Sequence, residues 1–246
     1  MEGTSGASRT VINGSGRLSL PLNITLGYKD KKLDKLLNRY CLGNMKVDLP
    51  KGALSEYEKE GITLKNLKNS NYAISYDYKS RKTESGFSSA TTAATDHILF
   101  SLNKSIIATS SSSCLSVILF CEELKLAAAV HIRALHAMYQ FHRYVYKNMF
   151  AFAFANMQKL VGGAYPVKAF IAGCNIPGKK SLYPFDRPFR MRGNYNIMRY
   201  LLPELIGRQI KIASVDIAGH QINQKLDMQT GEYTIYRNYF EESIIK

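Results

Sequence analysis

A cysteine and a histidine that lie seventeen residues apart are the side chains of this sequence best suited to covalent chemistry. Cys114 follows a run of four serines, and His131 ends an apolar run. A thiolate can attack an acyl carbon, while a neighbouring imidazole takes the thiol proton and later returns it to the leaving group. Thr109, just before the serines, is either an ordinary strand residue or a hydroxyl group that orients the imidazole.

The segment that carries these residues predicts a β-hairpin. Residues 115–120 form an apolar run interrupted by Ser116, Glu122 and Glu123 make a charged turn, and residues 124–130 form a second run that is apolar except for Lys125. Two strands joined in this way place Cys114 at the start of one strand and His131 near the end of the next. In an antiparallel pair such positions are neighbours.

The serines before Cys114 predict a small-residue turn with accessible backbone N–H groups. The N–H groups of Ser113 and Cys114 could then hold an oxyanion. The ordinary alternative for a lone cysteine is a buried core residue, and His131 could equally be a structural histidine. The residues alone leave both alternatives open.

Other combinations of residues point to less chemistry. His136 and His142 are six apart on a predicted helix and do not share a face, so we expect no metal site there. The four cysteines include no Cys-x-x-Cys pair, which is not typical of a disulfide framework. Asp216, close to Gly219, is interpreted as a turn residue. A glycine-rich loop of the phosphate-binding kind is not present.

Composition favours a globular protein with an acidic partner, and charge alone does not choose among nucleic acid, an anionic membrane surface and an acidic protein. The 246 residues carry a formal net charge of +14, and 46% are hydrophobic. Basic residues are spread along the chain rather than gathered in a block, which favours a solvated basic surface. The N-terminal residues lack the apolar stretch of a secretory signal, and we expect no transmembrane segment.

The chain predicts three consecutive regions and an α+β fold. Residues 1–16 are expected to be disordered, 17–95 to form a partly ordered extension with a loop over 69–89, and 96–246 to form the main domain. In that domain we expect antiparallel-rich sheets packed with two main helices, over 133–160 and 194–205, with 175–192 as a long loop. Further strands are expected over 167–172, 210–217, 224–228 and 232–236.

Residues 96–238 resemble the CheD-type glutamine deamidases, which act on chemoreceptors. That family has a Thr, a small turn ending in Ser-Cys, an apolar strand and a His seventeen residues after the Cys. Thr109, Ser113, Cys114 and His131 fall on these positions. The same core is similar to that of deamidating toxins such as cytotoxic necrotizing factor. Later family landmarks are matched in order by residues 172–174, 193–196, 216–219 and 230–231.

The resemblance implies a CheD-like mixed sandwich and hydrolysis of a glutamine side-chain amide through a thioester. Cys114 would be the nucleophile, His131 the base and Thr109 the orienting residue, with the Ser113 and Cys114 N–H groups as oxyanion donors. It implies no cofactor and no metal. The partner would be a protein that carries a reactive glutamine, with an acidic surface favoured, and not nucleic acid.

The identity of the target is left open by the resemblance. The polar N-terminal region suits an effector or toxin that is secreted into a host cell and modifies a host protein. The alternative enzyme is a divergent chemotaxis deamidase of the bacterial cytoplasm. A third hypothesis is a non-catalytic CheD-like binding module, because Ser112, Ala127 and Ala128 replace glycines of the family pattern.

Overall fold

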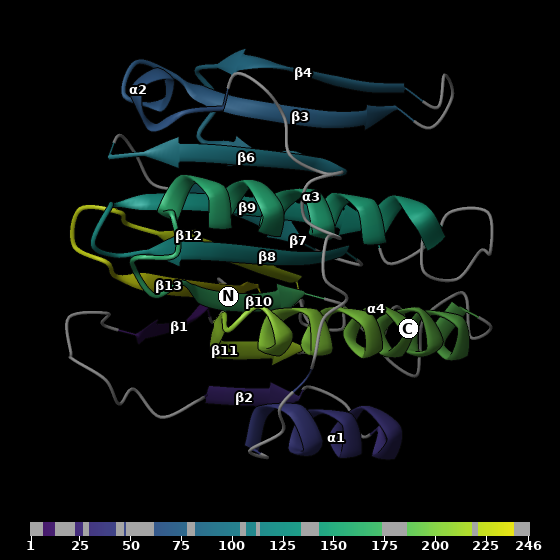
Figure 1. Ribbon diagram of the computed structural model, residues 1–246. Helices are drawn as coiled ribbons and strands as arrows, with labels where there is room; N and C mark the ends of the chain where they lie inside the picture. Colours follow the sequence, from purple (N-terminus) through teal and green to yellow (C-terminus); the bar gives the residue numbers. More distant parts are fainter. Residues whose placement is uncertain are drawn as a thin grey trace, which may run out of the picture.

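A computed structural model describes the chain over eleven ranges. These are residues 7–12, 23–26, 30–42, 47, 62–77, 82–103, 107–111, 114–133, 143–173, 186–217 and 221–238. Within them the protein has mixed α and β structure, as predicted, with two β-sheets and a layer of helices (Figure 1).

The larger sheet has eight strands and is mostly antiparallel. Its parallel pairs are β10 with β11 and β11 with β2. The β8–β9 hairpin lies at its centre, and almost all residues of both strands are buried, so the hairpin is covered on both faces. From edge to edge the order is β2 (Asn23–Leu26), β11 (Lys211–Ile217), β10 (Lys168–Gly173), β8 (Cys114–Cys121), β9 (Leu126–Arg133), β6 (His97–Leu102), β3 (Asn71–Asp77) and β4 (Lys82–Ser88).

The smaller sheet has five strands and packs behind the larger one (Figure 1). Its strands β12 and β13 pair as a hairpin and correspond to the strands expected over 224–228 and 232–236. Strand β5 pairs with β7 in parallel. The order is β1 (Ala7–Ile12), β13 (Tyr233–Asn238), β12 (Gln221–Leu226), β7 (Ile107–Ser111) and β5 (Thr92–Ala93).

Helices cover the other face of the eight-stranded sheet (Figure 1). This layer contains the long helices α3 (Arg143–Val161) and α4 (Asp186–Gly207), together with the shorter helix α1 (Lys31–Leu37). Asp30 caps α1 at its N-terminus, and α1 continues into the π-helix η1 (Asn38–Leu42). The short helix α2 (Leu64–Leu67) contacts β6. In the described residues, no helix is both long and apolar enough to span a membrane.

Alternation along β8 divides the core into two layers. Leu115, Val117 and Leu119 pack with the helices, whereas Ile118 and Phe120 pack against the five-stranded sheet. A strand buried on both faces reads as a continuous apolar run, as the sequence here does. The antiparallel pairing of β8 with β9 confirms the predicted hairpin, which contributes side chains to both layers of the core.

Several predicted boundaries differ from the structure. The loop expected over 69–89 contains the β3–β4 hairpin, in which Tyr72 and Ile74 are buried and Tyr72 contacts Phe87 edge-on. Alternating aromatic and β-branched residues, rather than the surrounding Ser and Lys, determine the structure there. Because β3 also pairs with β6, this part of the predicted extension belongs to the main sheet.

Part of the N-terminal region and the long helices also differ from the prediction. Ala7–Ile12, inside the region expected to be disordered, form strand β1 and pair with β13. Helix α4 begins at Asp186, within the predicted loop. Of the helix expected over 133–160, the structure describes α3 (Arg143–Val161), while Arg133 ends β9 and residues 134–142 lie outside the described ranges. The β-branched residues Thr10, Val11 and Ile12 suit a strand once β13 offers an edge to pair with.

Candidate active site

Cys114 is the first residue of β8 and is half-buried. It is not part of a disulfide. Ser112 and Ser113 lie outside the described residues, so the predicted oxyanion site at Ser113 and Cys114 stays a prediction. Cys121 closes the same strand and is fully buried. The two thiols therefore lie at opposite ends of one strand, with different access to solvent.

The register of the hairpin makes Cys114 and His131 diagonal neighbours. Cys114 pairs directly with Arg133, and His131 pairs directly with Ser116. Directly paired residues share a face of a sheet, and so do residues two apart on one strand. Cys114 and His131 therefore lie on the same face, the one that packs against the five-stranded sheet. Diagonal partners in an antiparallel pair are roughly 7–8 Å apart.

His131 is buried and is held in one tautomer. Its side chain is 3% exposed, and Nδ1 lies 3.1 Å from the carbonyl oxygen of Ala93. A carbonyl only accepts hydrogen bonds, so Nδ1 carries the proton and a neutral ring has its lone pair on Nε2. Among the described residues, Nε2 has no hydrogen-bond partner. The ring nitrogen that can act as a base is thus available.

The surroundings of His131 favour the neutral ring. Burial lowers the pKa of the imidazole below its ordinary value of 6.5, although the hydrogen bond to Ala93 opposes this effect. Electrostatic interactions with His97 and Arg133 lower the pKa further. A neutral imidazole at neutral pH can accept a proton, as a general base must.

Thr109 lies in β7, in the neighbouring sheet. By register it pairs with Gln224 of β12 and with Ala93 of β5. Its backbone is therefore next to the residue whose carbonyl holds His131, while its side chain lies outside what the structure describes. The contact seen to orient His131 comes from Ala93, which the sequence analysis missed because a backbone carbonyl leaves no signal in residue type.

A row of residues that are polar except for Ala172 crosses the eight-stranded sheet at this level. Direct partners along the row are Ser75, His97, His131, Ser116, Ala172, Asp216 and Thr25. His131, Ser116 and Asp216 are each at most 3% exposed. The prediction that Asp216 is a turn residue is wrong, because Asp216 lies inside β11. Strand pairing on both sides overrides the turn preference of Asp.

A buried hydrogen-bond chain joins the two sheets beside His131. Ser116 Oγ donates to the carbonyl oxygen of Ala172, 3.2 Å away, and accepts from Nε2 of Gln224. Tyr233 donates through its hydroxyl to Oε1 of Gln224 at 2.7 Å. Ser116, Gln224 and Tyr233 are fully buried. The chain links the strand of Cys114 to the strand that pairs with Thr109.

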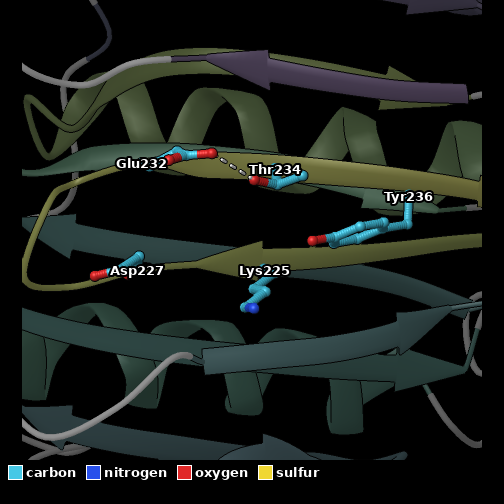
Figure 2. A pocket seen from close by; sticks show the side chains of 5 residues that line it. All are labelled: Lys225, Asp227, Glu232, Thr234 and Tyr236. Atoms are coloured by element: carbon cyan, nitrogen blue, oxygen red, sulfur yellow. Dashed lines mark hydrogen bonds between the residues drawn. The ribbon is translucent and has the colours of Figure 1, made fainter.

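A polar hollow on the five-stranded sheet is separate from this site. Its cavity volume is about 210 Å³, and Figure 2 shows Glu232 and Thr234 pointing toward each other along β13. The hollow is on the outer face, because the alternating residues Leu226 and Tyr233 point into the core. Lys225, Asp227, Glu232, Thr234 and Tyr236 line it.

A second hollow of about 400 Å³ lies at the C-terminal end of α4, where Cys41 contributes to its wall. Burial raises the pKa of the Cys41 thiol to about 12, which keeps it protonated and unreactive at neutral pH.

In the described residues, no group of three or more His, Cys, Asp and Glu side chains could hold a metal ion.

Comparison with known proteins adds no assignment. A scan against protein-family models gives no match, and a search of curated proteins gives none either. The interpretation of the site therefore depends on its own residues and on their geometry.

Proposed function

We propose that this protein is a protein-glutamine deamidase that uses Cys114 as its nucleophile and His131 as its base. The observation that carries the proposal is the state of His131. It is a buried, neutral imidazole with Nδ1 bound to Ala93, with Nε2 unpartnered among the described residues, and with Cys114 diagonal to it on the same face. A thiol and a base arranged in this way suit acyl transfer.

The reaction proceeds in two stages. His131 Nε2 takes the thiol proton while the sulfur bonds to the side-chain amide carbon of a glutamine. The resulting oxyanion is held by backbone N–H groups at Ser113 and Cys114. His131 then gives the proton to the amide nitrogen, the carbon–nitrogen bond breaks, and ammonia leaves behind a thioester. Water, deprotonated by His131, hydrolyses the thioester to glutamate and restores the thiol.

Thr109 is proposed as the side chain that assists Ala93 in orienting His131. Its register position next to Ala93 is compatible with this role. In other cysteine and serine hydrolases, a third group of this kind holds the imidazole in its working tautomer. No cofactor takes part in the reaction.

The substitutions that favour a non-catalytic binding module have another explanation at two positions. Ala127 and Ala128 are fully buried and pair with Phe120 and Leu119, close to the turn of the hairpin. Small side chains there allow β9 to pack closely against both layers. They lie three or four residues from His131 and do not contact the reacting groups through the strand register.

The substrate is proposed to be a host protein that an injected effector would meet, with chemoreceptors as the alternative. The net charge of +14 favours a target with an acidic surface near its glutamine. The test is mass spectrometry of host cytosol and of purified chemoreceptor fragments, each incubated with wild type and with Cys114→Ala. A glutamine converted to glutamate by wild type alone would establish the activity and the substrate class.

The same experiment can reject the proposal. No conversion in either mixture would leave the non-catalytic binding module as the better hypothesis. Conversion by the Cys114→Ala variant would show that another residue is the nucleophile.

A further inference from the structure

The turn between β5 and β6 wraps the end of β9 where His131 lies. It takes the chain from the five-stranded sheet to the eight-stranded sheet. At its start, the Ala93 carbonyl accepts from His131 Nδ1. At its end, the backbone N–H of Asp96 donates to the His131 carbonyl oxygen at 2.7 Å. The same short turn thus holds both the side chain and the backbone of His131.

The carboxylate of Asp96 fastens this turn to the next part of β9. Oδ1 accepts from the backbone N–H of Arg133 at 3.2 Å, and Oδ2 lies 2.9 Å from the Arg133 Nε. Asp96 is 2% exposed, while the Arg133 side chain is 50% exposed. One buried carboxylate therefore joins the turn to a residue two positions after His131.

Asp96 has an unfavourable backbone conformation for a residue with a side chain. Its φ is +64°, in the left-handed region. Residues other than glycine occupy this region infrequently, and Asp and Asn tolerate it best. Burial also raises the pKa of the Asp96 carboxyl, against the backbone hydrogen bond and the charge of Arg133. Strain and a buried acid persist where the surrounding contacts require them, and they gather at functional sites.

We propose that Asp96 is the positioning residue for His131, and that it fixes the Nδ1–H tautomer by holding the Ala93 carbonyl against the ring. The carboxylate fastens the turn to Arg133, the turn sets the place of Ala93, and Ala93 sets the proton on Nδ1. Its catalytic meaning rests on the proposed deamidase function, because that tautomer leaves Nε2 as the base. The positioning itself is a property of the turn and can be measured without a substrate.

The test compares Asp96→Ala and Asp96→Asn in the full chain by ¹⁵N NMR of the imidazole nitrogens, with His131 assigned from a His131→Gln sample. In wild type we expect the Nδ1–H tautomer to dominate. Asp96→Ala should shift the tautomer ratio about two- to tenfold, the range that corresponds to loss of one ordinary hydrogen bond. Asp96→Asn should retain most of the preference, because Asn tolerates the left-handed region and can still accept from the Arg133 N–H.

Asp227→Ala is the matched control. The Asp227 carboxylate also accepts from two backbone N–H groups in a turn, those of Gln229 and Thr230 at 2.9 and 3.1 Å. It lies in the β12–β13 hairpin, so its removal should leave the His131 signals unchanged. If Asp96→Ala does not fold, Arg133→Gln replaces it and should shift the ratio in the same direction.

An unchanged His131 tautomer ratio in folded Asp96→Ala, or in Arg133→Gln where that variant replaces it, would overturn the positioning role. A shifted ratio in a protein whose wild type deamidates no glutamine would support the positioning role and reject only the proposed function. Deamidation by wild type with no shift in the variants would do the reverse.

Discussion

Cys114 and His131 lie diagonally across the β8–β9 pair, two residues out of direct register, with Arg133 and Ser116 as their direct partners. The proposed reaction would therefore require the thiol to reach along the sheet toward Nε2. The carbonyl of Ala93 holds the His131 ring through Nδ1, and Cys114 is half-buried at the start of its strand.

Replacing Cys114 should abolish deamidation and leave the fold intact. Cys114 is at the edge of the core, so Cys114→Ala removes little buried surface, and we expect a change in unfolding free energy of less than about 1 kcal/mol. Loss of the nucleophile removes the thioester route entirely. Urea unfolding and the mass-spectrometric assay measure the two effects.

Cys121→Ala is the matched control for that variant, because Cys121 is fully buried at the other end of β8. It should keep the activity and lose more stability than Cys114→Ala. Retained activity in Cys114→Ala would contradict the assignment of the nucleophile.

The burial of His131 should make stability fall in mild acid. The unfolded imidazole titrates near its ordinary pKa of 6.5, and the folded one at a lower pKa. Below pH 6.5 the unfolded state thus binds more protons, and the free energy of unfolding decreases as the pH drops toward the folded pKa. The slope from this group cannot exceed about 1.4 kcal/mol per pH unit.

His131→Gln provides the comparison, because an amide side chain does not titrate. Denaturant unfolding from pH 5 to 8 should give a flatter dependence below pH 6.5 for the variant and parallel curves above it. Equal slopes in the acid range would show that the His131 pKa is not lowered by folding.

Thr109 should matter for rate more than for stability. If its hydroxyl orients His131, Thr109→Val should lower kcat/KM by roughly ten- to hundredfold, less than loss of the base itself, which is typically 10²–10⁴-fold. Thr109→Ser retains a hydroxyl and should recover most of the activity. Steady-state kinetics on a peptide that contains the target glutamine gives the comparison, and equal rates for Val and Ser would exclude the hydroxyl.

The buried chain of Tyr233, Gln224 and Ser116 should stabilise the contact between the sheets. Gln224→Leu leaves the fully buried Tyr233 hydroxyl without its acceptor, at a cost of about 1–3 kcal/mol. Tyr233→Phe removes that hydroxyl, so the double variant should be more stable than the sum of the two single effects predicts. Strictly additive unfolding free energies would show that the two side chains are not coupled.

Local sequence patterns sufficed to predict those strands whose residue types match their burial in the fold. The β8–β9 hairpin, strands β10 and β11, and the β12–β13 hairpin each combine an apolar or alternating run with a turn signal. The β3–β4 hairpin was missed because its buried Tyr72 and Ile74 stand among polar residues that also suit a loop. Strand β1 depends on β13, more than 220 residues away, and no local signal predicts such a pairing.

By itself the sequence determined the types of the groups that are proposed to react, their separation and the hairpin that brings Cys114 near His131. Side-chain chemistry and the period of two in a strand are local properties, so they can be read from residues. The tertiary structure alone decided the diagonal register, the burial of His131, the Ala93 carbonyl that holds its Nδ1, and the Asp96 turn that holds Ala93. These depend on backbone atoms and on contacts between distant strands, which residue types do not encode one position at a time.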